Sequence, residues 1–154
     1  MTNLVTHTIE IDNEKILSSM IEYTRIKAEA MIQHHGLRLS EFLSVKYSLP
    51  RQSGLTTAAF KIADSRKHGN AFIVAPKLSM LRHFRTSSSS MSVDQISRPS
   101  VLMGANLQDY DLIIADPWEC FSEHHRDVVD QFHEKACFDS ITKGTRPPIL
   151  LKLG

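Results

Sequence analysis

The chain has 154 residues, of which 42% are hydrophobic, and a formal net charge of +1 at pH 7. This length suits one domain with a substantial core. The near-neutral net charge excludes an overall positive field that attracts nucleic acid, but it does not exclude a local basic patch. Two cysteines indicate a reducing compartment rather than a disulfide framework. No signal peptide or apolar run of about 18 residues is found, so we expect a soluble cytoplasmic protein without membrane contact.

The first predicted element is an amphipathic helix over residues 12–36. Asp12 or Asn13 supplies a cap at its start, and Gly36 is a normal helix end. Residues 1–11 alternate loosely and are expected to form an edge strand or a tail. Apolar residues recur in the helix at steps of three and four, which places them on one face: Ile16, Leu17, Met20, Ile21, Ala28, Met31 and Ile32.

Strands and helices alternate through the rest of the chain. Short apolar runs such as residues 71–75 are typical of strands buried on both faces of a parallel sheet. Residues 86–92 are mostly serine and are expected to form a mobile loop. The alternation predicts an α/β fold, with a mainly parallel sheet flanked by helices in one domain over residues 1–154. The predicted strands cover residues 42–49, 71–75, 98–103, 111–116 and 149–153, and the later helices cover 56–68, 77–85 and 122–138.

Two of these helices have predicted inward faces. In the helix over residues 56–68 this face consists of Ala59, Phe60, Ile62 and Ala63. In the helix that begins at Ser122, a candidate cap, the inward residues are Val128, Val129, Phe132, Ala136 and Cys137.

Residues 49–57 (Leu-Pro-Arg-Gln-Ser-Gly-Leu-Thr-Thr) join a predicted strand to a predicted helix, which is the layout of a phosphate-binding loop. In the pattern Gly-x₄-Gly-Lys-[Ser/Thr], Gly54 and Thr56 match, whereas Leu55 replaces the lysine. Gly54 allows the backbone to approach phosphates, and Thr56 holds the position of the Mg²⁺-binding hydroxyl. The further candidate contacts are Arg51, as a substitute cation, with Gln52, Ser53 and Thr57 as donors. The alternative is a strand-to-helix turn without a ligand.

A second candidate group follows the apolar run of residues 112–115. Asp116 stands at the predicted carboxyl end of a strand, where nucleotide sites hold the Mg²⁺-coordinating acid. ATP-hydrolysing sites commonly place a glutamate next, but here that residue is Pro117. Glu119 is the candidate for a displaced substitute. The alternative is a buried strand that ends in a solvated acid.

A third candidate is a basic surface in residues 77–85, directly after a predicted strand. Lys77, Arg82 and Arg85 are the residues expected to contact a nucleic-acid backbone or a partner. A solvated helix face is the more frequent explanation of such a group. The histidines and cysteines of residues 120–137 do not form a known zinc spacing, so surface histidines and packed cysteines are favoured there.

Taken together, residues 49–60, 71–84 and 110–119 resemble, in order and spacing, three motifs of phage large terminases and related helicase-like P-loop ATPases. The first resembles their Pro-Arg-Gln-x-Gly-Lys-Thr-Thr loop, the second a DNA-contacting turn, and the third the Walker B strand. The resemblance implies a RecA-like sheet, a phage or mobile-element origin, and ATP or ADP bound with Mg²⁺ at Thr56 and Asp116. Leu55 and Pro117 depart from the family at two chemically essential positions.

These observations lead to three hypotheses. The first is a catalytically degenerate P-loop domain that binds a protein partner, such as an ATPase machine or a host factor, or nucleic acid, as a regulator or decoy. A phage-encoded chain of this kind would act in the host cytoplasm. The second is a working ATPase in which Arg51 replaces the lysine and Glu119 positions water. The third is a purely structural subunit.

Overall fold

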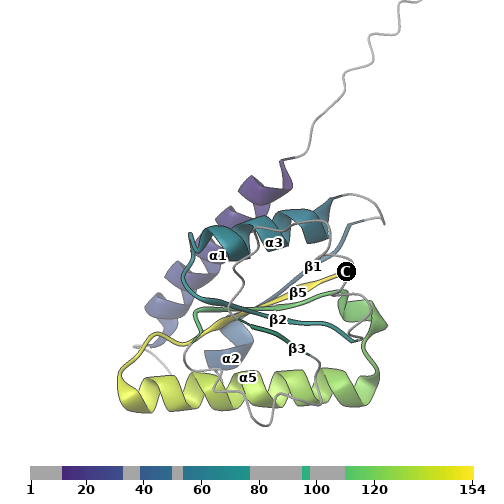
Figure 1. Ribbon diagram of the computed structural model, residues 1–154. Helices are drawn as coiled ribbons and strands as arrows, with labels where there is room; N and C mark the ends of the chain where they lie inside the picture. The colour runs from purple at the N-terminus through teal and green to yellow at the C-terminus, as the bar shows by residue number, and fades with distance from the viewer. Residues whose placement is uncertain (1–11, 33–38, 50–53, 77–94, 98–109) are drawn as a thin grey trace, which may run out of the picture.

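The computed structural model describes residues 12–32, 39–49, 54–76, 95–97 and 110–154 (Figure 1). It has the predicted α/β architecture, with a parallel sheet between helices. In chain order the elements are α1 (Asn13–Ile32), α2 (Leu39–Phe42), β1 (Ser44–Tyr47), α3 (Leu55–Ser65), β2 (Ala71–Val74), β3 (Gln95–Ser97), β4 (Leu112–Ala115), the 3₁₀ turn η3 (Trp118–Cys120), α5 (Glu123–Lys143) and β5 (Ile149–Leu153).

The five strands form one sheet in the order β1-β5-β4-β2-β3, and every neighbouring pair is parallel. The last strand of the chain, β5, therefore lies between β1 and β4. Its Leu150 is in register with Ser44 on one side and with Ile113 on the other. Because all strands run the same way, their carboxyl ends meet at one edge of the sheet.

Helices cover both faces of the sheet. Figure 1 shows α1 and α3 on one face and α5 with α2 on the other. Side chains alternate between the faces along each strand. In β5, Ile149, Leu151 and Leu153 belong to the core cluster beneath α1 and α3, whereas Leu150 belongs to the cluster beneath α5. The inward residues predicted for α3 are all buried, as are Val129, Ala136 and Cys137 of α5.

The helix starts follow the predicted caps. The Asp12 carboxylate accepts a hydrogen bond from the Lys15 N–H at 3.1 Å, and the Ser122 hydroxyl accepts one from the His125 N–H at 3.1 Å. The predicted end of α5 at residue 138 is wrong, because the helix continues to Lys143. It stops at Gly144, which adopts a left-handed conformation (φ 71°) and donates its N–H to the Ile141 carbonyl.

The strand predicted over residues 42–49 is wrong at its start, where residues 39–42 form the helical turn α2. Strand β1 begins at Ser44 because its ladder with β5 covers four residues of each strand. The short strand β3 was not predicted. The predictions for residues 1–11, 33–36, 77–94 and 98–103 fall outside the described residues.

Gly69 precedes β2 in a conformation that other residues rarely adopt (φ 93°), and a Cβ there would collide with the Asp111 side chain. We expect Gly69→Ala to lower the free energy of unfolding by about 2–4 kcal/mol, from backbone strain and the displaced carboxylate. The matched control is Gly144→Ala, which also has positive φ but finds no atom within 4 Å of the new Cβ, so only about 1 kcal/mol is expected. Urea denaturation measures both values, and equal losses would contradict the steric part of the explanation.

Candidate functional site

The sheet brings two of the predicted site residues together at its carboxyl edge. Thr56 lies in the first turn of α3, which follows β1, and Asp116 directly follows β4. The Thr56 side chain lies close enough to the Asp116 carboxyl to lower the pKa of that group. The Asp116 backbone N–H also donates to the Val74 carbonyl at 3.1 Å, which fixes the end of β4 against β2.

Asp116 is a buried acid with an unused acceptor. Its residue is 8% exposed, and its Oδ2 atom is buried and accepts no hydrogen bond from any described residue. Burial raises the pKa of the Asp116 carboxyl to about 6, the Thr56 hydrogen bond acts in the opposite direction, and the charge of Glu119 raises the pKa further. A buried carboxylate oxygen without a donor is costly unless a donor or a cation reaches it.

Gly54 forms the junction between the loop and α3. It adopts a left-handed conformation (φ 81°), and its carbonyl accepts from the Ala58 N–H at 3.0 Å, so the helix begins directly after it. A glycine cap supplies no side-chain acceptor for the first-turn N–H groups of α3. These groups and the helix dipole favour an anion at this edge of the sheet.

Leu55, at the position of the expected lysine, points into the protein. It is 6% exposed and packs in the core cluster beneath α1 and α3. The residue therefore contributes apolar packing at the start of α3 and no charge. Thr57 is exposed on the next position of the helix.

Glu119 lies in η3, at the same edge of the sheet as Asp116. Its carboxylate occupies the space beside Gly154, at the end of β5, so tightly that a Cβ at position 154 would collide with it. Arg126 of α5 holds this turn by donating to the carbonyls of Trp118 and Glu119 at 3.2 and 3.1 Å. Arg126 has no signal in the sequence, because its partners are backbone carbonyls, which belong to no residue motif.

The other predicted contacts are not placed. Arg51, Gln52 and Ser53, and the basic residues Lys77, Arg82 and Arg85, lie outside the described residues.

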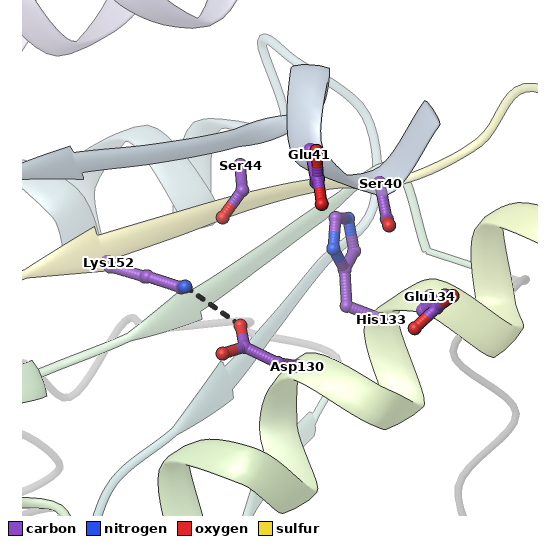
Figure 2. A pocket seen from close by; sticks show the side chains of 7 residues that line it. All are labelled: Ser40, Glu41, Ser44, Asp130, His133, Glu134 and Lys152. Carbon is purple, nitrogen blue, oxygen red and sulfur yellow. Dashed lines mark ion pairs between the residues drawn. The ribbon is translucent and has the colours of Figure 1, made fainter. Parts of the chain in front are cut away.

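A separate cleft of about 500 Å³ lies on the α5 side of the sheet, between α2, β1, β5 and α5 (Figure 2). Lys152 reaches across it to pair with Asp130 at 2.8 Å, and its ammonium also lies 4.5 Å from the centre of the Trp118 ring. Burial lowers the pKa of His133 to about 4, against a 2.8 Å hydrogen bond from its ring to the Pro148 carbonyl. His133 is therefore neutral at pH 7, and its ring is held by the Pro148 carbonyl.

The histidines and cysteines of α5 do not gather into a metal site. His133 and Cys137 are in contact at 3.4 Å, but burial raises the pKa of the Cys137 thiol to about 12, which disfavours the thiolate that a metal ion would bind. Among the residues that the structure describes, no three histidine, cysteine or acidic side chains are placed to hold a metal ion.

In the same part of the chain, no helix has both the length and the apolar character to cross a bilayer.

Comparison with known proteins adds no assignment. Neither the models of known protein families nor the curated protein sequences gave a match to this chain.

We expect Asp116→Asn to stabilise the protein at pH 7.5 by about 2–3 kcal/mol. The folded-state pKa of about 6 is above the unfolded value of 3.8, so the folded state holds the proton more tightly. Stability from this group is complete below pH 4 and is lost as the pH rises through 6. Asparagine keeps an acceptor for Thr56 and never ionises.

Urea denaturation at pH 4 and pH 7.5 measures this difference. The gain from Asp116→Asn should be present at pH 7.5 and nearly absent at pH 4, whereas the control Asp127→Asn, at an exposed position of α5, should change little. A gain of the same size at both pH values would mean that the carboxylate is not the source.

Proposed function

We propose that the chain is a catalytically degenerate P-loop domain with a RecA-like sheet, which binds Mg²⁺-nucleotide weakly and acts by binding a partner rather than by hydrolysing ATP. The observation that carries the proposal is the contact between Thr56, in the first turn of α3, and the buried Asp116 after β4. In the resembled family these positions belong to the hydroxyl and the acid of the magnesium site.

The position of the pair in the fold supports a ligand site. In open parallel sheets, ligands bind beyond the carboxyl ends of the strands. Thr56 and Asp116 occupy that edge, and the uncapped start of α3 faces it with Gly54 as the point of closest backbone approach. The proposed anion is the phosphate chain of ATP or ADP.

Magnesium fits the residues that are present. Mg²⁺ prefers oxygen ligands and is commonly bound by one or two protein groups, with waters and substrate phosphates completing its shell. The Thr56 hydroxyl and the unpartnered Oδ2 of Asp116 are such groups. When bound, the ion neutralises phosphate charge. The protein's own part is to hold both oxygens at the end of α3.

Two substitutions support a loss of catalysis. At position 55 a buried leucine replaces a lysine, which removes a charge-assisted contact of about 1.5–3 kcal/mol from nucleotide binding. Directly after Asp116, Pro117 has no group that can accept a proton. The absence of the lysine ammonium at position 55 is expected to lower the rate of ATP hydrolysis as the loss of an oxyanion donor does, by about 10²–10³.

A protein partner is the first class of target in this proposal. Helix α1 exposes Tyr23 and Ile26, at 68% and 67%, and α5 exposes Phe138 at 69%. Large apolar side chains in exposed helix positions are typical of interaction surfaces when they cluster.

Nucleic acid is the second class of target, through the basic residues of 77–85. A phage-encoded regulator or decoy in the host cytoplasm fits a domain that keeps the strand–loop–helix layout of a P-loop but has Leu55 in place of its lysine.

A working ATPase is the alternative that one observation favours. Glu119 lies at the carboxyl edge of the sheet, close enough to Asp116 to raise its pKa, and Arg126 fixes the turn that carries it. In this alternative Glu119 orients the attacking water in place of the residue at position 117.

We expect Leu55→Lys to tighten Mg-ATP binding by about 10- to 100-fold, because it restores a charge-assisted contact to the phosphates. Calorimetric titration of the unmodified chain and the variant measures this. Leu55→Met is the matched control, since it keeps an apolar side chain of similar volume and should leave the affinity unchanged. Thr56→Ala in the Leu55→Lys background should remove the gain. Because Leu55 is buried, urea denaturation first compares the stability of Leu55→Lys with that of the unmodified chain. An unchanged affinity in a variant of unchanged stability would refute the phosphate-binding loop.

We expect no efficient ATP turnover by the unmodified chain, in a phosphate-release assay with saturating Mg-ATP. Steady turnover that disappears in both Glu119→Gln and Asp116→Ala would favour the working ATPase over the degenerate domain. Turnover that survives both changes would point to a contaminating enzyme.

A further inference from the structure

A second cleft, of about 380 Å³, lies at the opposite, amino edge of the sheet. It is bounded by α1, by the residue before β1, and by the segment between α5 and β5. Its apolar walls are Ala28, Leu43 and Pro147, and its charged residues are Arg25, Glu29 and Arg146. Asp111, which contacts Arg25, is separated from Asp116 by the whole of β4, so this cleft is roughly 16 Å from the Thr56–Asp116 pair.

Arg25 is an unusually buried cation. The residue is 8% exposed, and its guanidinium donates one hydrogen bond, from Nη2 to the Asp111 carbonyl at 3.1 Å. Burial lowers the pKa of Arg25 to about 10, and the nearby charge of Arg146 lowers it further, against the opposing charges of Asp111 and Glu29. A guanidinium has five N–H donors, so most of its donor capacity is not used by this bond.

Two arginines line this cleft, and the nearby carboxylates of Asp111 and Glu29 act on Arg25 from beyond ion-pair distance. Neither Arg25 nor Arg146 forms an ion pair with a carboxylate of the described residues. The Asp111 carboxylate is already engaged, because its Oδ2 accepts from the Asn70 N–H at 3.1 Å. The charge of Arg146 lowers the pKa of Arg25 more than either Asp111 or Glu29 alone raises it, so an added anion between the two guanidinium groups would relieve their repulsion.

We propose that this cleft binds an oxyanion, a phosphate or carboxylate group held between the guanidinium groups of Arg25 and Arg146. Planar guanidinium groups bind both kinds of anion in a bidentate manner. The apolar walls favour a ligand that carries its anionic group on a small apolar body. Glu29, which also lines the cleft, opposes anion binding by its charge. The inference is independent of the proposed function, since it involves other residues at the other edge of the sheet.

The test is a titration of the isotope-labelled full chain, followed by the NMR signals of the Gly144, Thr145 and Arg146 amides. The probes are inorganic phosphate and benzoate, each at constant ionic strength against chloride. We expect saturable shifts with at least one probe. The tighter probe then identifies the class of anion, phosphate or carboxylate.

Three variants sharpen the test. Arg146→Ala, at an exposed position, should weaken binding about tenfold or more. Lys143→Ala removes the same charge from the neighbouring end of α5 without lining the cleft, and should leave the affinity unchanged. Glu29→Gln should tighten binding about two- to fivefold, because a repulsive charge is lost.

Two results would overturn the proposal. One is the absence of saturable shifts with both probes. The other is an equal loss of affinity in Arg146→Ala and Lys143→Ala, which would mean that the anion responds only to the overall charge of the chain. Neither result bears on the Thr56–Asp116 pair, which the nucleotide titrations test separately.

Discussion

The arrangement of the site depends on the hydrogen bonding of β5 between β1 and β4. This strand is registered with β1 from Leu150 to Leu153 and with β4 from Ile149 to Lys152. It therefore joins the strand that leads to Thr56 to the strand that ends at Asp116. Without β5, the two would not belong to one sheet, and their carboxyl ends would have no common edge. A segment near the end of the sequence thus brings together Thr56 and Asp116, which are 60 positions apart in the chain, because parallel pairing is non-local.

Much of the fold is predictable from local pattern. The apolar runs that became β2, β4 and β5 were identified because a strand buried on both faces has few polar residues, and Ser122 was identified because a hydroxyl cap has a local partner. The errors have non-local causes. Residues 39–42 have enough apolar character for either state, and the extent of β1 is set by its partner strand. The order of the strands in the sheet cannot be predicted from local sequence patterns, because it depends on which distant strands pair.

The site was predictable to a smaller degree. Thr56 and Asp116 could be selected because the residue types that bind phosphate and magnesium recur at fixed positions after strands, and the structure places them together. The burial of Leu55 could not be derived, since the first turn of a helix can present a residue inward or outward. The pairing of Arg25 with Arg146 had no signal either, because more than a hundred residues separate them and only the packing of α1 against the amino edge of the sheet brings them together.

The most direct test of the account is an NMR titration of the isotope-labelled chain with Mg-ADP, which detects weak binding residue by residue. If this edge binds nucleotide, the Thr56, Thr57 and Asp116 amides show saturable shifts that require Mg²⁺, while the Arg146 amide at the other edge of the sheet shifts much less. Shifts confined to other parts of the chain, or none at millimolar nucleotide, would contradict the proposal that this edge is a retained nucleotide site.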